Sequence, residues 1–351
     1  MSATFSANST ACDFLTQHHI WTPKQLSQRV AEMKRTEYLI EGLIPQQAIN
    51  ISVGDSGLGK SPLNYLEGLC VAAGVPFLNR PVKQGRVLYL DYENSSLQSS
   101  KLISTLSSFL NLSEPPDNFR LWNKNDSLGP LDLHRACEEF KPAWIIVDAL
   151  TGMYPTIERD NPTAASALQE LRTLMAAHGC AVTLLHHLRK PNDNPRFTRE
   201  PLETAEWNTW FYQARGPGVL INGSDVRLGI DRPLLSTNED LLIIKGFERV
   251  NGPIPIIRIT RVRDESGDPI GYKLLAGADQ LTNLAHRAAY EQLPDEFNFT
   301  TAKQVYGKSD QPTIDFLNKC RSAGILQKLR KGWSYGQKTR RIPHAQHGVR
   351  R

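Results

Sequence analysis

The sequence predicts an α/β protein whose larger domain contains a mostly parallel sheet covered by helices on both faces. Short runs rich in valine, isoleucine and leucine alternate with longer helical stretches, which is typical of parallel strands joined by helical crossovers. These runs lie at 48–53, 87–90, 144–147 and 181–185. The chain has 351 residues, of which 40% are hydrophobic and 22% charged, as expected for a globular protein of about two domains.

Changes in composition divide the chain into four predicted segments. The first is a polar arm with one helix that begins at Thr22-Pro23, because threonine is a good N-cap and proline suits the first helical position. After Arg215 the strands become closely spaced, which predicts antiparallel additions to the sheet at 219–221, 226–230, 241–244 and 256–259. The predicted segments are the arm 1–36, the sheet domain 37–280, a small domain 281–338 and a basic tail 339–351.

Cysteine usage and hydropathy indicate a protein that stays in the cytoplasm. The five cysteines are scattered and form no CxxC pair, so we expect reduced thiols and no structural zinc. No apolar run is long enough for a membrane span, and the N-terminus lacks the pattern of a signal peptide. We therefore expect no membrane contact.

A phosphate-binding loop follows the first predicted strand. Residues 54–61 match GxxxxGK[ST], in which glycines bring backbone N–H groups close to phosphate oxygens at a helix N-terminus. Lys60 is expected to reach the β- and γ-phosphates, and the Ser61 hydroxyl is expected to bind Mg²⁺. The predicted ATP-binding residues are Gly54, Asp55, Ser56, Gly57, Leu58, Gly59, Lys60, Ser61 and Pro62.

Two further strands end in acidic residues that suit nucleotide hydrolysis. Asp148 ends an apolar strand and fits the Walker B aspartate, which holds Mg²⁺ partly through water. Glu93 follows another strand and is our candidate for the group that activates the attacking water, with Asp91 as the alternative. A third possibility is that Glu93 only favours the start of a helix.

The order of these motifs resembles the RecA/DnaB/KaiC group of ATPases, and within it the branch of RepA-like hexameric helicases. The resemblance spans about residues 38–275. It rests on 42–45 (Gly-Leu-Ile-Pro), the loop 54–61, 87–93 (Val-Leu-Tyr-Leu-Asp-Tyr-Glu), 145–148 (Ile-Ile-Val-Asp), His186-His187 and 214–218 (Ala-Arg-Gly-Pro-Gly). It implies a RecA-like P-loop fold and a homo-oligomer, with a hexamer expected.

The resemblance also implies roles for individual residues. It favours Glu93 as the catalytic carboxylate, and it matches His187 or His186 to a γ-phosphate sensor. The alternative for the two histidines is a metal pair. Arg215 resembles the arginine that acts in trans on a neighbour's nucleotide, and Lys245 and Arg249 are further candidates for that interface.

The chain departs from the compact family pattern at 189–213, a polar insertion with four aromatic residues. Loops in this region of ring helicases can face the central channel, so the insertion could stack on single-stranded DNA. The alternative, which we favour, is a packing lid, because Trp207, Trp210 and Phe211 recur at helical spacing.

The C-terminal region predicts a winged-helix domain, for which DNA is the favoured ligand and a protein partner is the alternative. Three helices, near 285–293, 300–305 and 312–323, precede a predicted hairpin with strands at 325–329 and 333–335. Residues 316–351 contain ten Lys or Arg and no acid. The predicted DNA-contacting residues are Thr313, Asn318, Lys319 and Arg321 of the last helix, and Lys328, Arg330 and Lys331 of the wing.

Together these observations predict an oligomeric ATPase acting on DNA, either single-stranded in a ring channel or duplex through the winged helix. The setting implied by the resemblance is a replicative helicase or replication-initiation ATPase of a bacterial mobile element. A KaiC-like regulatory ATPase without unwinding activity is the main alternative. A P-loop kinase is a weaker one.

Overall fold

The computed structural model describes residues 20–32, 36–190, 199–234, 236–275, 277–281, 283–322, 325–328 and 339–341. The chain divides into two compact units, Met1–Glu37 and Tyr38–Arg351. In the first unit, helix α2 (Pro23–Glu32) begins after Thr22, whose side-chain oxygen accepts a hydrogen bond from the backbone N–H of Gln25 at 3.3 Å. This is the N-cap that the sequence predicts.

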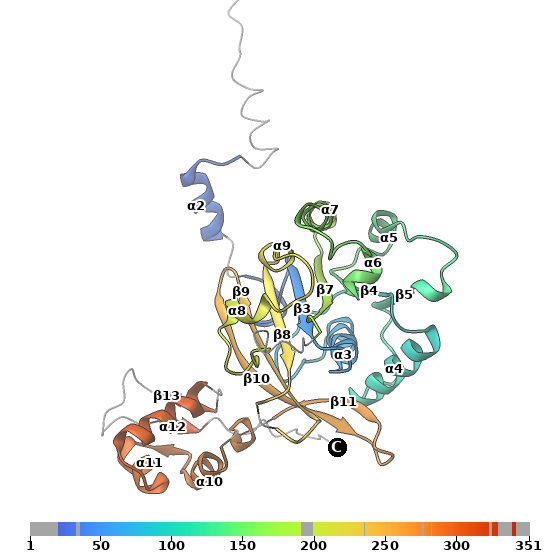
Figure 1. The fold of residues 1–351 in the computed structure, drawn as a ribbon. Coiled ribbons are helices and arrows are strands. Elements are labelled where there is room, and N and C mark those ends of the chain that lie inside the picture. Colours follow the sequence, from blue (N-terminus) through green and yellow to red (C-terminus); the bar gives the residue numbers. More distant parts are fainter. Residues whose placement is uncertain are drawn as a thin grey trace, which may run out of the picture. The chain divides into compact units, whose positions relative to one another are not determined.

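The second unit contains a nine-stranded sheet in the order β11-β10-β9-β8-β3-β7-β6-β4-β5. Its six strands from β8 to β5 run parallel, and β9, β10 and β11 extend it in antiparallel fashion (Figure 1). The strands are β3 (Ile49–Gly54), β4 (Val87–Asp91), β5 (Phe119–Asn123), β6 (Trp144–Asp148), β7 (Ala181–His187), β8 (Val226–Asp231), β9 (Leu241–Glu248), β10 (Gly252–Arg263) and β11 (Pro269–Leu274). This confirms the predicted α/β fold with a mostly parallel central sheet.

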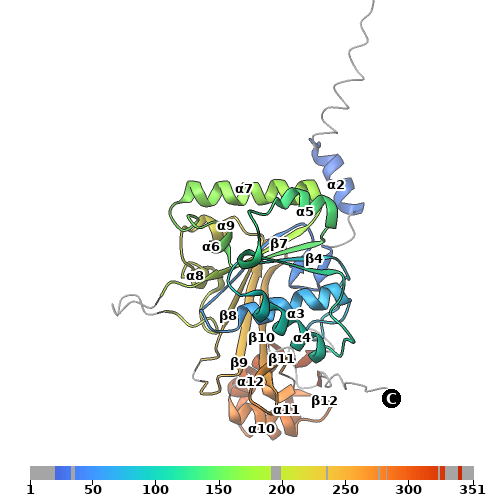
Figure 2. The same ribbon diagram turned by 90° about the vertical axis from the view of Figure 1, so that its right-hand side faces the viewer.

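Helices cover both faces of the sheet. Figure 2 shows α5 and α7 on one face and α3 and α4 on the other, and two apolar cores fill the layers between helices and strands. The connecting elements are β1 (Tyr38–Ile40), β2 (Ile44–Pro45), α3 (Lys60–Ala73), α4 (Ser96–Phe109), η1 (Lys124–Asp126), α5 (Leu133–Phe140), α6 (Leu150–Met153), α7 (Asn161–His178), α8 (Trp207–Phe211) and α9 (Val219–Asn222). The parallel strands β3, β4 and β6 are buried at every residue, which explains their continuous apolar sequences.

Several local predictions were wrong. The run 219–221 is the short helix α9, because three apolar residues are too few to distinguish a helical turn from a strand. Strand β8 runs parallel to β3, so only β9, β10 and β11 are antiparallel additions. The sequence patterns did not predict β5 and β11, which are the two edge strands of the sheet.

The C-terminal residues form helices and a small sheet around a third apolar core that contains Phe316, Leu317 and Cys320. The sheet has the order β12-β14-β13. Its elements are η3 (Gly277–Gln280), α10 (Leu284–Gln292), β12 (Glu296–Phe297), α11 (Phe299–Tyr306), α12 (Asp310–Ser322), β13 (Leu326–Lys328) and β14 (Thr339–Arg341). The predicted second hairpin strand, 333–335, lies outside the described residues.

Two details of the C-terminal predictions need correction. The segment predicted as a basic tail begins with strand β14, where the Arg341 guanidinium lies over the Tyr290 ring at 4.6 Å and donates to the Leu293 carbonyl. Thr313 is fully buried and donates to the Ser309 carbonyl at 2.8 Å, so it does not face a ligand. Arg330 and Lys331 lie outside the described residues. Within the described part of the chain, no helix has the length and apolar character needed to cross a bilayer.

Candidate nucleotide site

The loop between β3 and α3 begins the candidate site. Gly59 has φ +87° at the start of α3, and a Cβ atom there would lie 2.4 Å from the Tyr272 hydroxyl oxygen. A Cβ on Gly54 would lie 2.7 Å from the Ile230 carbonyl oxygen. Glycine is therefore required at position 59 by the backbone conformation, and at position 54 by the close approach of strand β8.

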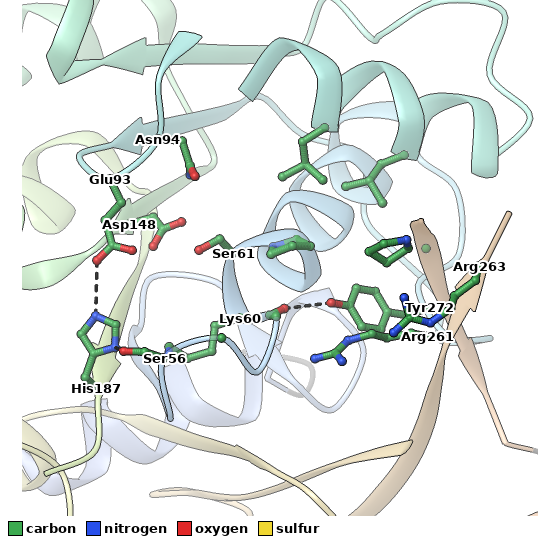
Figure 3. A pocket seen from close by; sticks show the side chains of 17 residues that line it. Ser56, Lys60, Ser61, Glu93, Asn94, Asp148, His187, Arg261, Arg263 and Tyr272 are labelled. Carbon is green, nitrogen blue, oxygen red and sulfur yellow. Dashed lines mark hydrogen bonds and ion pairs between the residues drawn. The ribbon is translucent and has the colours of Figure 1, made fainter. Parts of the chain in front are cut away.

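A cavity of about 530 Å³ opens beside this loop. It is lined by Ser56, Gly57, Gly59, Lys60, Ser61, Pro62, Glu93, Asn94, Leu102, Leu106, Asp148, His187, Arg261, Arg263, Pro269, Gly271 and Tyr272 (Figure 3). Six of the nine predicted ATP-binding residues are among them. The other three, Gly54, Asp55 and Leu58, belong to the loop but do not line the cavity.

Lys60 lies at the base of the cavity and is held by the loop itself. Its ammonium group donates to the carbonyl oxygens of Gly54 and Asp55, each at 2.8 Å, and lies 3.3 Å from His187 Nδ1. Burial lowers the pKa of Lys60, while the nearby carboxylates of Asp148 and Glu93 oppose that effect. Because the ammonium group has lost most of its hydration and lies beside the cavity, it is well suited to bind an anionic phosphate chain.

Asp148 and Ser61 supply oxygen ligands beside Lys60. The end of β6 pairs with the end of β4, and the buried Asp148 carboxylate accepts hydrogen bonds from the Ser61 side chain and, at 2.7 Å, from the Tyr89 hydroxyl. Burial raises the pKa of Asp148 to about 6. A carboxylate and a hydroxyl fit the oxygen-rich coordination of Mg²⁺, which keeps several waters and uses few protein ligands.

Glu93 and His187 form a hydrogen-bonded pair on one side of the cavity (Figure 3). His187 Nε2 lies 3.3 Å from Glu93 Oε1, and this hydrogen bond is the main cause that lowers the pKa of Glu93. His187 Nδ1 also lies 3.4 Å from the Ser56 hydroxyl (Figure 3). His187 thus connects the phosphate loop with the turn that carries Glu93.

The sequence left two choices open: His186 or His187 as the phosphate sensor, and Glu93 or Asp91 as the catalytic carboxylate. In each pair only one residue lines the cavity. His186 is fully buried, its Nε2 lies 2.9 Å from the Arg215 carbonyl oxygen, and burial lowers its pKa to about 4, whereas His187 lines the cavity. Asp91 is also buried and accepts hydrogen bonds from the backbone N–H groups of Glu93 and Asn94, whereas Glu93 lines the cavity. Among the described residues, no cluster of three or more histidine, cysteine or acidic side chains is arranged to hold a metal ion.

The far wall of the cavity comes from β10 and β11, which the sequence analysis did not connect with the site. The Arg261 guanidinium donates to the Leu58 carbonyl, and the Tyr272 hydroxyl donates to the Gly59 carbonyl at 3.0 Å. Arg263 forms a bidentate pair with Asp240, with contacts of 2.7 to 2.9 Å. Gly59 and Tyr272 are 213 positions apart along the chain, so no local motif predicts their contact.

One comparison with known proteins, a match to a family model, covers most of the residues of this site. Residues 21–193 match the family model described as "AAA domain". This stretch includes the phosphate loop and the strands β4, β6 and β7. No curated protein sequence matches the chain. Among solved structures, the RadB recombinase is similar over 66% of this chain and 92% of its own, with 16% identity and a TM-score of 0.42.

The basic residues predicted for a subunit interface do not line the cavity beside the phosphate loop. Arg215 forms a 3.0 Å ion pair with Glu158, and its side chain is 44% exposed. Lys245 donates to the carbonyls of Leu202 and Ala205 and is therefore engaged within the chain. Arg249 is half-exposed and donates to the carbonyls of Asn222 and Ser224.

The described part of the insertion packs against the sheet domain. Trp210 and Phe211 are fully buried, and Trp207 stacks on Phe247 of β9 with ring centroids 3.7 Å apart. Tyr212 is 52% exposed. These contacts favour the packing alternative over a stacking surface made by all four aromatic rings. Arg199, also in the insertion, forms an ion pair with Asp55 of the phosphate loop.

Proposed function

We propose that this protein is an oligomeric ATPase that hydrolyses ATP and acts on DNA, in the manner of a RepA-like replicative helicase or replication-initiation ATPase of a bacterial mobile element. The observation that carries the proposal is the convergence of Lys60, Asp148 and the Glu93–His187 pair in one cavity beside the phosphate loop. A cation, an oxygen ligand set and a carboxylate base are the groups that phosphoryl transfer to water requires.

Each side chain has a distinct role in this proposal. Lys60 binds the β- and γ-phosphates, and Ser61 with Asp148 would hold Mg²⁺, which when bound neutralises charge on the phosphate oxygens. Glu93 orients the attacking water and accepts its proton, for which its lowered pKa keeps it ionised. His187 contacts both the loop and Glu93, so it is placed to report the state of the γ-phosphate to the turn at 93.

Completion of the site by a neighbouring subunit is part of the proposal. Arg215 is partly exposed and does not line the cavity of its own chain, which suits an arginine that acts in trans. A ring, with a hexamer as the expected state, would bring such an arginine to each nucleotide.

DNA contact is assigned to the C-terminal domain, for which we propose a winged-helix fold. The order α10, β12, α11, α12, β13, β14 is the order of a winged helix, and α12 would then be the recognition helix. Lys319 and Arg321 are exposed in its last turn. Both are placed to approach phosphates, and single-stranded DNA in a ring channel is a second proposed ligand.

One set of assays tests the proposal. We expect Lys60→Ala to lose ATP binding, and Glu93→Gln to bind ATP·Mg²⁺ normally but to hydrolyse it at least about 100-fold more slowly. ATP hydrolysis, nucleotide binding and strand separation of a forked DNA duplex are measured for the wild type and both variants. DNA binding is followed at two salt concentrations, because phosphate contacts by Lys and Arg weaken steeply with salt. Wild-type turnover by Glu93→Gln would remove that residue from catalysis.

The buried aromatic residues of the insertion favour one alternative, a KaiC-like regulatory ATPase. Trp210 and Phe211 are unavailable for base stacking in this arrangement. ATP hydrolysis by the wild type without strand separation of the forked duplex supports this switch and contradicts the helicase. A protein that stays monomeric with ATP·Mg²⁺ would instead support a P-loop kinase.

A further inference from the structure

Two stacked tyrosines lie directly beneath the acidic residues of the site. Tyr65 of α3 and Tyr89 of β4 have ring centroids 3.9 Å apart and an interplanar angle of 23°. Both side chains are fully buried, and Phe119 packs 6.0 Å from each ring. The rings therefore occupy fixed positions, and small displacements of one hydroxyl are restricted by the packing of both rings.

The two hydroxyl groups diverge to different carboxylates. The Tyr89 hydroxyl donates to Asp148 Oδ2 at 2.7 Å, and the Tyr65 hydroxyl donates to Asp91 Oδ2 at 2.6 Å. Burial raises the pKa of both phenols, so each hydroxyl keeps its proton and acts as a donor. Buried hydrogen bonds to carboxylates are short and strong because one partner is charged.

Asp91 connects the Tyr65 hydroxyl with the turn that carries Glu93. Its Oδ1 accepts the backbone N–H groups of Glu93 at 3.0 Å and Asn94 at 2.9 Å. Its Oδ2 also accepts from the Asn94 side chain and from the Ser99 hydroxyl of α4, each at 2.9 Å. Asp91 thus binds α3, α4 and the backbone of the Glu93 turn at once, and it has no part of its own in lining the cavity.

We propose that Tyr89 and Tyr65 are positioning residues with separate tasks: Tyr89 orients the Asp148 carboxylate for the divalent cation, and Tyr65, acting through Asp91, orients Glu93 for attack by water. The inference rests on the proposed ATPase function. One hydroxyl of the stacked pair positions the cation ligand and the other positions the catalytic carboxylate. Removing the Tyr89 hydroxyl should therefore affect cation binding, and removing the Tyr65 hydroxyl should affect hydrolysis. Mutating a side chain that orients a metal ligand typically lowers metal affinity or activity by about 10- to 100-fold.

The test compares Tyr89→Phe with Tyr65→Phe, which remove one oxygen each and leave the stacked rings in place. For Tyr89→Phe we expect the Mg²⁺ concentration for half-maximal binding of a fluorescent ATP analogue to rise by about 10-fold, with kcat at saturating Mg²⁺ within about twofold of wild type. For Tyr65→Phe we expect kcat to fall by about 10-fold, with the Mg²⁺ requirement unchanged. Binding of the analogue in EDTA should be the same for both variants and the wild type.

A matched control separates positioning from general destabilisation. Tyr290 in the C-terminal domain is also buried, and its hydroxyl donates to the Ile325 carbonyl at 3.2 Å. Tyr290→Phe should lower the melting temperature without changing the Mg²⁺ requirement or kcat. If both site variants behave like this control, or if each alters both parameters equally, the division of tasks is wrong.

ATP binding and hydrolysis by the wild type distinguish a failure of the proposed function from a failure of this inference. A wild type that neither binds nor hydrolyses ATP·Mg²⁺ contradicts the proposed function, whereas an active wild type with unaffected Phe variants contradicts only this inference. If a Phe variant does not fold, Ser99→Ala tests the role of Asp91, because it removes another hydrogen-bond donor to Asp91 from a different helix. Ser99→Ala should lower kcat at an unchanged Mg²⁺ requirement, and an unchanged kcat overturns the inference.

Discussion

The parallel and antiparallel parts of the sheet serve the same cavity in different ways. The parallel strands β3, β4, β6 and β7 end at one edge, where Glu93, Asp148 and His187 follow or end them and line the cavity. From the antiparallel strands, Arg261 and Tyr272 bind backbone carbonyls of the phosphate loop. In the proposed function, one part supplies the reactive groups, and the other holds the phosphate loop through its carbonyl groups.

This difference has a physical origin in the loop's hydrogen-bonding capacity. A phosphate-binding loop uses its N–H groups for the anion, so its carbonyl groups need donors from elsewhere. Lys60 donates to the carbonyls of Gly54 and Asp55, while β10 and β11 provide donors for Leu58 and Gly59. Changes in the antiparallel part should therefore reduce nucleotide affinity through the loop's shape.

The largest expected effect comes from Gly59→Ala, at the point where the two parts meet. A Cβ atom at φ +87° and 2.4 Å from the Tyr272 hydroxyl cannot be accommodated without moving the loop or the strand. We expect ATP affinity to fall at least about 100-fold and the free energy of unfolding to fall by about 1–3 kcal/mol. Titration calorimetry with ATP·Mg²⁺ and denaturant unfolding measure the two quantities.

Gly252→Ala is the matched control, because Gly252 has φ +86° but no atom within 4 Å of its added Cβ. It should cost about 1 kcal/mol of stability from backbone strain alone and leave ATP affinity unchanged. Equal ATP affinities of the Gly59 and Gly252 variants would show that the contact with Tyr272 does not shape the loop.

Sequence reasoning reached the parallel part of the site because its residues follow buried apolar strands. Glu93 and Asp148 stand next to such runs, and the glycine pattern marks the loop, so local signals suffice there. Arg261 and Tyr272 lie on strands of mixed composition, and β11 begins with proline and contains glycine, which hides an edge strand. Their role follows from long-range pairing, which no short pattern encodes.

The choices between neighbours also required three dimensions. His186 and His187 are adjacent in sequence, but successive side chains of a strand point to opposite faces. Only His187 lines the cavity, and His186 is buried against the Arg215 backbone. The same holds for Asp91, whose five hydrogen bonds could not be inferred from its position after an apolar strand.

A smaller effect is expected from Arg261→Ala, which tests the antiparallel part without adding a clash. This change removes the donors to the carbonyls of Leu58 and Glu239, and lost hydrogen bonds of a charged donor should weaken ATP binding by about 10-fold. The exposed pair Arg135–Glu139 offers a control, since Arg135→Ala should leave affinity unchanged. Wild-type ATP affinity in Arg261→Ala would mean that Tyr272 and Lys60 alone suffice to shape the loop.

The smallest expected effect is a shift in pH dependence on removing the imidazole that connects the loop with Glu93. The His187 hydrogen bond lowers the pKa of Glu93, so the carboxylate of the wild type stays ionised to lower pH. In His187→Ala that cause is absent, the pKa of Glu93 rises, and the acidic limb of the kcat/KM profile moves to higher pH. The lowered pKa also stabilises the folded state above the carboxyl's unfolded pKa, and this contribution disappears as pH falls through the folded value.

The stability difference between wild type and His187→Ala should therefore narrow in acid, which thermal unfolding across pH measures. His178→Ala provides the control, because His178 lies at the end of α7 beside His134 and does not line the cavity. Its pH profile should coincide with that of the wild type. An acidic limb that stays in place in His187→Ala would mean that the titration of Glu93 is governed by Lys60 and by burial, and that His187 contributes to the site only through the loop.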